Sequence, residues 1–420
     1  MPSSADSSLT RANMRFAAAI VLTGIVAGIV GWVCIHLLHL VEYLAWGVTS
    51  GTLLEAVTAS SPIHRVTVLA LAGLIAALSW TLFFRKNRTI VSVSEAVHGR
   101  RMPVLRTLWH AITQIIIVGL GASIGREVAP REVSAALGAW ISDTLGLDSR
   151  DRRIIVACGA GAGLAAVYSI PLSGAVYTLE ILLVTLNART VAPALTICAI
   201  AVLVTTGWER PAAFYTVPSV SATLSLTVWA LICGPLIGWA GLQFRRIVHS
   251  FENARPRSSH LLWTLPLALT AVGVISIWVP SVLGNGQASA QTQFDAAWLG
   301  GLGLRVALVT LLAKAVTTLV TIRSGGWGGT LTPSVALGAG LGAVTGMLWS
   351  LMWPGTSLAA FVFIGAAVFL GSSMKAPFTG LILVIEFTHQ GAELLVPACV
   401  AIGGAVAATA WAQRSATSDT

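Results

Sequence analysis

The sequence predicts an all-α integral membrane protein, and three observations support this prediction. Of the 420 residues, 55% are hydrophobic and only 10% are charged, whereas roughly a quarter of the residues of a soluble domain are charged. The mean hydropathy is +0.83, because apolar runs of membrane-crossing length follow one another along the chain. Glycine accounts for 41 residues, many of them inside these runs, where they allow helices to approach closely or to unwind.

The predicted organisation is a single transmembrane transport domain between two polar tails. Residues 1–15 form the N-terminal tail, residues 16–412 the domain and residues 413–420 the C-terminal tail. The apolar run that starts at Phe16 contains no small-residue cleavage site, so we expect a retained first helix rather than a signal peptide. Further apolar stretches lie near residues 65–84, 108–124, 133–147, 153–187, 190–207, 222–243, 261–283, 299–322, 330–353, 357–371 and 376–411.

The positive charge of the chain is typical of a membrane protein. The 25 lysines and arginines give a formal net charge of +9, and most of them lie in short loops between apolar runs, as the positive-inside rule expects. We therefore expect the lipid bilayer, and no nucleic acid, as a partner. We place the chain in the cell (inner) membrane of a prokaryote. The five cysteines lie singly in apolar stretches and form no CxxC pair, so no disulfide framework, metal site or cofactor is predicted.

Two pairs of segments indicate an internal repeat. Residues 159–180 match residues 365–386 with an offset of 206, which superposes Pro171 on Pro377 and ends each segment in a glutamate. A second pair, GREVAP and GGTLTP, repeats a G-x-x-x-x-P frame at an offset of 203. Duplicated halves with helices interrupted at corresponding positions are typical of transporters, whose substrate site lies where the halves meet. The predicted halves cover about residues 16–207 and 222–412.

The two G-x-x-x-x-P frames are the candidate anion site. Because proline suits the first turn of a helix, we expect one helix to begin near Pro130 and another near Pro333. First-turn amides have no partner within the helix, and the helix dipole places about half a positive charge there. Two such helix ends that meet at mid-membrane would bind an anion without a full positive charge, which suits permeation.

Glu127 lies immediately before the first predicted helix start. When it is ionised, its carboxylate can occupy the helix-terminal amides itself, and when it is protonated it vacates them for the anion. An intramembrane ionisable residue is functional by default, although Glu127 could instead pair with Arg126 at an interface. The repeat-related Glu180 and Glu386 are interpreted as structural caps or packing residues.

Four more charged residues in or near apolar stretches have no single interpretation. Lys314 and Lys375 fall in apolar surroundings, where they either raise the local potential for anions, extend to the interface or pair with a carboxylate. The spacing of Arg131 and Glu132 assigns them no role.

These motifs resemble the CLC family of chloride channels and proton-coupled chloride transporters. The family frame GREGP appears as residues 125–130 and the GxFxP frame as residues 329–333, and the stretches AVYSIPLSGAVYTLE and TTLVTIRSGGWGGTLTPSVALGAGLG also resemble the family closely. The resemblance implies a CLC-like fold of about 18 helices in two inverted-topology repeats, with broken helices that meet at mid-membrane. It also implies a homodimer with a separate pathway in each subunit.

The resemblance further implies that Glu127 is the gating residue and that the amides of Val128, Leu331 and Thr332 line the anion path. The predicted anion-binding residues are Gly125, Arg126, Val128, Ala129, Thr330, Leu331 and Thr332. The predicted helix-start and break residues are Pro130, Gly328, Gly329 and Pro333.

The sequence also departs from the family pattern. The serine motif GSGIP is missing near residues 88–99, where Ser92 or Ser94 is the candidate substitute. Most antiporters of the family carry a second, inward-facing glutamate at the position that Ile181 occupies here, and an apolar residue cannot relay a proton. There are three further departures from the family pattern. Val128 replaces the second glycine of GREGP, Leu331 replaces the phenylalanine of GxFxP, and no tyrosine occurs near the C-terminus.

The leading hypothesis is chloride or other halide transport through a CLC-type pathway gated by Glu127, either channel-like or weakly coupled to protons. The alternatives within this class are a chloride/proton antiporter and a fluoride exporter. From a different class, residues 121–125 loosely resemble the surroundings of the serine of an intramembrane protease. That reaction would require a histidine beside Ser123, and the histidines lie mainly at segment ends. A structural or receptor role is a further alternative. The paired broken helices disfavour it, because such a role does not require them.

Overall fold

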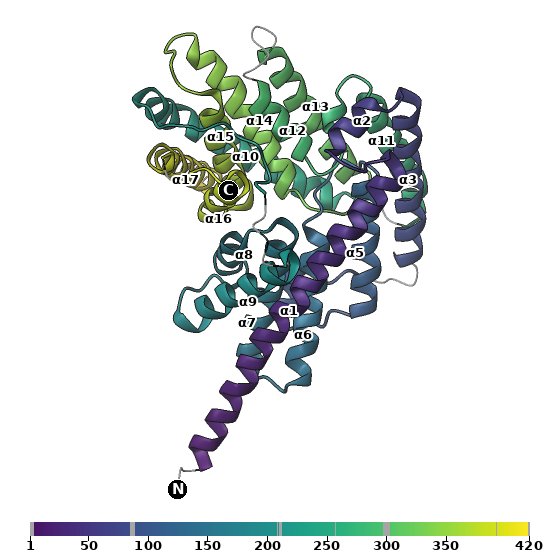
Figure 1. The fold of residues 1–420 in the computed structure, drawn as a ribbon, viewed down its shortest axis with the longest axis vertical. Coiled ribbons are helices and arrows are strands. Elements are labelled where there is room, and N and C mark those ends of the chain that lie inside the picture. The colour runs from purple at the N-terminus through teal and green to yellow at the C-terminus, as the bar shows by residue number, and fades with distance from the viewer. Residues whose placement is uncertain are drawn as a thin grey trace. The chain divides into compact units, whose positions relative to one another are not determined.

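The computed structural model describes residues 4–84, 89–207, 209, 212–256, 258–296, 303–391 and 393–418. Over these residues the chain forms seventeen α-helices, one π-helical and two 3₁₀ segments, and no strand (Figure 1). This confirms the predicted all-α fold. Within the described ranges, seven helices are long and apolar enough to cross a membrane, and they lie at Thr10–Trp46, Pro62–Phe84, Ala188–Thr206, Leu224–Asn253, Gly303–Arg323, Leu331–Ser350 and Leu395–Ala412.

The first of two compact units comprises residues 1–37, 86–115 and 127–212. Its helix α7 is buried on every side from Ile154 to Tyr168 and packs against α6, α8 and α9. A helix that is apolar all round is stable only in such a central position. The elements of this unit are the greater part of α1 (Ser4–Trp46), α4 (Val93–Val97), most of α5 (Val104–Gly119), α6 (Val128–Thr144), α7 (Ser149–Tyr168), α8 (Pro171–Tyr177), η1 (Thr178–Leu183) and α9 (Ala188–Thr206).

The second unit comprises residues 38–85, 116–126 and 213–420. Its central helix is α15, which is buried almost all round and packs against α10, α14, α16 and α17, while α3 and α11 lie side by side (Figure 1). The elements of this unit are α2 (Leu53–Ala59), α3 (Pro62–Phe84), α10 (Leu224–Asn253), η2 (Ser258–His260), α11 (Leu261–Ile275), η3 (Pro280–Val282), α12 (Gln287–Asp295), α13 (Gly303–Arg323), α14 (Leu331–Ser350), α15 (Leu358–Met374), α16 (Pro377–Thr388) and α17 (Leu395–Ser418).

The internal repeat reappears in the local geometry of both units. Helix α7 is followed by Ser169 and α15 by Lys375, each in the left-handed conformation, with φ of 58° and 56°. Two residues later Pro171 and Pro377 open α8 and α16 at the first helical position. All four residues obey the offset of 206. In both copies of the repeat, one helix ends and the next begins in the same way, so the shared sequence specifies a shared turn.

Three short helices, α2, α4 and α12, were not predicted. They are too short, and α12 with the sequence QASAQTQFD too polar, to stand out as apolar runs. The apolar stretch 376–411 proves to be two helices, because His389 adopts a left-handed conformation (φ 52°) that ends α16. The two polar tails continue the terminal helices, since α1 begins at Ser4 and α17 extends to Ser418.

Candidate functional site

The two glycine-rich breaks pair with each other through their backbones. The N–H of Gly125 donates to the carbonyl of Gly329 over 2.7 Å, and the N–H of Gly329 donates to the carbonyl of Gly125 over 2.8 Å. Both glycines belong to the second unit. Gly328 fits beside this pair only because it lacks a side chain, since a Cβ there would lie 2.9 Å from the Gly125 oxygen. Non-helical backbone inside a membrane protein needs such internal hydrogen bonds.

Each break leads into a helix that starts without a side-chain cap. Helix α6 begins at Val128 after Glu127, and α14 begins at Leu331 after Thr330; neither preceding residue makes a capping hydrogen bond with its side chain. Both helices begin two residues before the prolines, so Pro130 and Pro333 lie in the first turn. Proline is tolerated there because its missing N–H has no partner within the helix. Ala129, Leu331 and Thr332 are buried.

Glu127 is completely buried, with 0% of its surface exposed. The hydroxyl of Tyr168, at the end of α7, donates to its Oε2 over 3.4 Å. Its backbone carbonyl accepts a hydrogen bond from Arg131 Nε over 3.0 Å. Arg131 in turn donates through Nη1 to the Tyr177 hydroxyl over 2.8 Å and lies over the ring of Tyr177. Two tyrosines and an arginine of the first unit therefore hold the start of α6.

In the second unit the guanidinium of Arg126 lies over the ring of Phe214, 5.9 Å from its centre. The flat face of the guanidinium therefore packs on the ring, as in other cation–π contacts of arginine.

Lys314 holds the loop before the first break. It is 1% exposed, and its ammonium donates over 2.9 Å to each of three oxygens, the hydroxyl of Ser123 and the carbonyls of Val282 and Gly284. The lysine therefore neither extends to the interface nor takes a carboxylate as one of these three acceptors. Ser123 also contacts the hydroxyls of Thr317 and Thr318. Because its three hydrogens are donated, the ammonium cannot act as a base for Ser123, and no histidine is among these partners.

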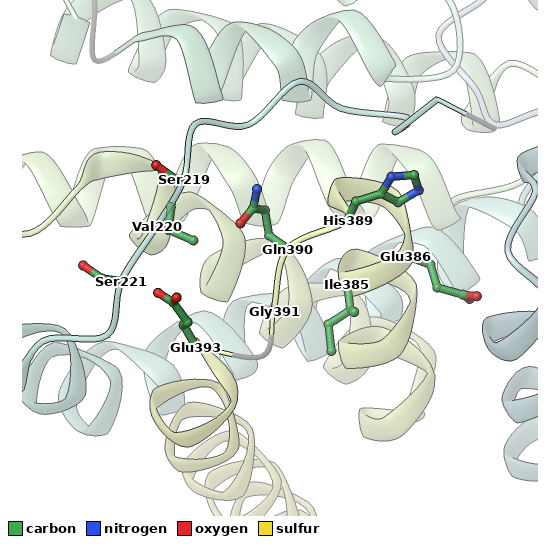
Figure 2. Close-up of a pocket in the computed structure, with 9 residues that line it drawn as sticks. All are labelled: Ser219, Val220, Ser221, Ile385, Glu386, His389, Gln390, Gly391 and Glu393. Atoms are coloured by element: carbon green, nitrogen blue, oxygen red, sulfur yellow. The ribbon is translucent and has the colours of Figure 1, made fainter. Parts of the chain in front are cut away.

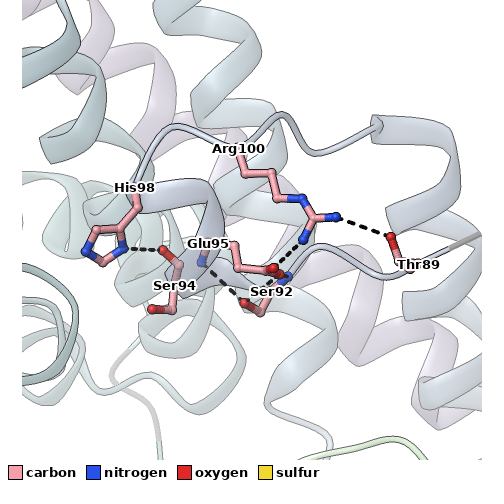
Figure 3. A network of polar contacts seen from close by, with 6 residues as sticks. All are labelled: Thr89, Ser92, Ser94, Glu95, His98 and Arg100. Atoms are coloured by element: carbon pink, nitrogen blue, oxygen red, sulfur yellow. Dashed lines mark hydrogen bonds and ion pairs between the residues drawn. The ribbon is translucent and has the colours of Figure 1, made fainter.

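The candidate serines lie at the start of the short helix α4 (Figure 3). Ser92 caps this helix: its hydroxyl accepts the N–H of Glu95 over 3.2 Å, and its own N–H donates to Glu95 Oε2 over 2.8 Å. Glu95 also forms an ion pair with Arg100. The carbonyl of Ser94 accepts a hydrogen bond from His98. Ser92 and Ser94 are both exposed, and the hydroxyl of Ser92 serves the local turn.

The cap predicts a pH dependence for α4. The N–H of Ser92, and then its hydroxyl and the Arg100 guanidinium, hold the pKa of Glu95 below its ordinary value of 4.5. A lowered pKa stabilises the fold above the ordinary value, and this stabilisation is lost as the pH falls through the folded-state value. The free energy of unfolding of the detergent-solubilised protein should therefore fall on acidification by about 0.5 kcal/mol or less more in wild type than in Glu95→Gln, because the Glu95 side chain is 41% exposed and water screens its charge. Parallel pH curves for the two proteins would contradict this prediction.

The remaining repeat-related residues lie on η1 and α16. Glu180 and Ile181 are half-buried on the π-helical segment η1. Glu386, on α16, lines an open pocket of about 730 Å³ together with His389, Glu393 and the segment 219–221. Figure 2 shows the Glu386 and Glu393 carboxylates pointing away from each other. Among the residues that the structure describes, no group of three histidine, cysteine or carboxylate side chains could hold a metal ion.

Sequence reasoning missed Tyr168 and assigned no role to Glu132. Tyr168 is one of only four tyrosines, and its place directly before the turn at Ser169 was a usable signal. Glu132 lies buried in α6 beside polar residues of α5, which no spacing within α6 could indicate.

Comparisons with known proteins agree with this architecture. The family model described as voltage gated chloride channel matches residues 72–410. Among curated relatives, the voltage-gated ClC-type chloride channel ClcB from strains of Escherichia coli is 28% identical over 383 residues, which are 87% of this chain and 89% of the relative.

Solved structures share the fold at low sequence identity. A slow cyanobacterial Cl⁻/H⁺ antiporter gives a TM-score of 0.80 at 18% identity, over 94% of each chain. A CLC-type fluoride/proton antiporter gives 0.67 at 20% identity, over 92% of this chain and 94% of the other. A eukaryotic CLC transporter gives 0.69 at 18% identity, over 95% of this chain and 72% of the other. These likenesses, together with the seven apolar helices, identify a multi-pass integral membrane protein of CLC fold.

Proposed function

The chain belongs to the voltage gated chloride channel (CLC) family, and from this premise we propose that it carries chloride through a pathway gated by Glu127. Anion transport is the function that membership of this family supports. The proposal places the protein in a bacterial inner membrane and includes the homodimer that the resemblance implies.

One observation carries the proposal: the reciprocal pairing of Gly125 and Gly329 directly before two helices that lack side-chain caps. Helix starts offer amides and a partial positive charge to an anion. We assign the binding groups to the first-turn amides, those of Val128, Leu331 and Thr332. Uncharged amides hold an anion weakly enough for it to leave.

Glu127 is the proposed gate because its carboxylate is buried one residue before α6. An ionised carboxylate competes with the permeating anion for the helix start, whereas a protonated one does not. Tyr168 supports this role, since its hydroxyl can donate to the carboxylate in the position seen here.

The test is chloride efflux from proteoliposomes. We expect wild type to move chloride, and Glu127→Ala to move it several-fold faster and without the pH dependence that Glu127 confers. Glu252→Gln, at the partly exposed end of α10, is the matched control and should behave as wild type. If neither wild type nor Glu127→Ala moves chloride, the proposal fails. Fluoride efflux that outpaces chloride in the same vesicles would instead select a fluoride exporter.

The absence of a carboxylate at Ile181 favours a channel-like or weakly coupled pathway. A chloride gradient imposed on the same proteoliposomes should therefore drive little proton movement. Strict stoichiometric proton movement would select the chloride/proton antiporter.

A further inference from the structure

The first unit contains a second buried carboxylate, Glu132, which the proposed pathway does not use. Glu132 is 6% exposed, and two buried side chains of α5 reach it. Gln114 Nε2 donates to Glu132 Oε2 over 3.3 Å, and His110 Nε2 lies 3.8 Å from the same oxygen. His110 and Gln114 are four residues apart, so they lie one above the other on one face of α5. One titratable side chain, His110, and one amide, Gln114, therefore converge on one carboxylate oxygen.

This arrangement differs from a structural ion pair. A carboxylate removed from water has to be paired or protonated, since the free energy of an isolated buried charge is prohibitive. Histidine is the side chain whose charge changes most readily near neutral pH. The pair of Glu132 and His110 can accept or release a proton while the carboxylate keeps a polar neighbour. Intramembrane ionisable groups placed in this way are candidates for proton binding.

Gln114 provides the second, independent observation. It is completely buried, and its Oε1 has no hydrogen-bond partner among the residues that the structure describes. As placed, its NH₂ group serves the ionised form of Glu132. Rotation of the amide by 180° would present Oε1 to a protonated Glu132, whose O–H would then donate to it. One side chain can thus satisfy Glu132 in both protonation states.

The other charged groups on α5 and α6 are exposed or have partners of their own. On α6 the neighbouring Arg131 is bound to the Glu127 carbonyl and to Tyr177, and at its far end Asp143 pairs with Arg152 of α7. Arg106, one turn before His110 on α5, is exposed.

Helix α4 also packs on α6, and its one charged residue, Glu95, pairs with Arg100. His110 therefore lies 3.8 Å from Glu132, and Arg131 is the arginine whose charge acts on Glu132. Glu127, directly before α6, is the next buried carboxylate toward the start of that helix.

Glu127 and Glu132 are close enough to influence each other. They are five residues apart, which corresponds to about 7.5 Å along the helix axis. At the effective dielectric constant of protein interiors, a unit charge on Glu132 changes an equilibrium of a charged group at this distance on the order of ten-fold, whether that group is the Glu127 carboxylate or an anion at the start of α6. The hydrogen bond from Arg131 to the Glu127 carbonyl also joins the two positions mechanically.

We propose that Glu132, His110 and Gln114 form a proton-binding site whose occupancy controls anion flux at the start of α6. The ligand is H⁺, which is taken from water and adds to the Glu132 carboxylate or to His110. The inference uses the proposed function only for its flux measurement. It assigns the proton a regulatory role and does not require exchange of protons for chloride.

The flux experiment removes the gate first, so that the pH response that is measured does not come from Glu127. In Glu127→Ala proteoliposomes, chloride efflux should change on the order of ten-fold between about pH 3.5 and about pH 8, the range that brackets the ordinary pKa values of Glu and His. Adding Glu132→Gln, which resembles the protonated carboxyl group in shape, should abolish this change. The Glu127→Ala/Glu132→Gln protein at about pH 8 should match Glu127→Ala at about pH 3.5. Adding Glu252→Gln instead should leave the change intact.

Two further measurements keep the inference falsifiable by itself. Adding His110→Gln to Glu127→Ala should reduce or displace the pH response, and an unchanged response would overturn the inference even if the Glu132 variant does not fold. Infrared difference spectra on a pH step should show a buried carboxyl band that Glu132→Gln removes. If wild type carries no anion but the band is present and lost in the variant, the proposed function fails while the proton site stands. A band unaffected by Glu132→Gln, or a pH response unaffected by it, contradicts the proton site.

Discussion

Replacing Lys314 by methionine should abolish chloride efflux and lower the stability of the detergent-solubilised protein by roughly 3 kcal/mol. The ammonium is the shared donor for Ser123, Val282 and Gly284. Methionine fills a similar volume but donates nothing, so two buried carbonyls lose a hydrogen bond. Each such loss costs about 1–3 kcal/mol, partly offset because the ammonium no longer has to be buried.

The loss of activity should exceed the loss of stability. Ser123 lies two residues before Gly125, so the lysine fixes the loop that enters the paired glycines. A site whose backbone moves by even 1 Å loses much of its function.

Arg305→Met is the matched control for this prediction. Arg305 is an exposed cation on the same helix, α13, and its replacement should leave both measurements near wild type. The two measurements are thermal unfolding in detergent and chloride efflux. A Lys314→Met protein as stable and active as Arg305→Met would show that the ammonium does not hold the loop.

Gly328→Val should reduce chloride efflux by about ten-fold or more. A Cβ at this position would meet the Gly125 oxygen at 2.9 Å and Ile124 Cγ1 at 2.9 Å, and a backbone oxygen in a reciprocal pair cannot move aside without breaking it. Overpacking of this kind costs about 1–3 kcal/mol. The strain falls on the pair of Gly125 and Gly329, which precedes both helix starts. We therefore expect it to lower chloride efflux.

Gly403→Ala tests whether glycine replacement as such is harmful. Gly403 lies in α17, and a Cβ there meets no atom within 4 Å, so alanine should be neutral or slightly stabilising, as in other helices. Efflux and thermal unfolding of the two variants are measured side by side. Equal efflux from both would mean that the close packing at Gly328 has no bearing on the pathway.

Much of the fold could be predicted because it depends on local chemistry. Hydropathy identified the membrane-crossing helices, and glycine and proline marked where helices end and begin. The offset of 206 predicted a duplicated segment, and the left-handed turns at Ser169 and Lys375, each followed by a proline, repeat the same geometry. The roles assigned to Glu127, the helix-start amides and the two serines remain predictions until transport is measured.

The sequence by itself determined the membrane character, the helix interruptions and the family, because composition, periodicity and backbone preference act over a few residues at a time. Only the tertiary structure decided that Gly125 pairs with Gly329, that Lys314 binds Ser123 across a separation of 191 residues, and that His110 and Gln114 reach Glu132. The physical reason is that a buried polar group takes the partner that packing brings within about 3 Å. Residue order does not fix that partner when the two groups lie on different helices.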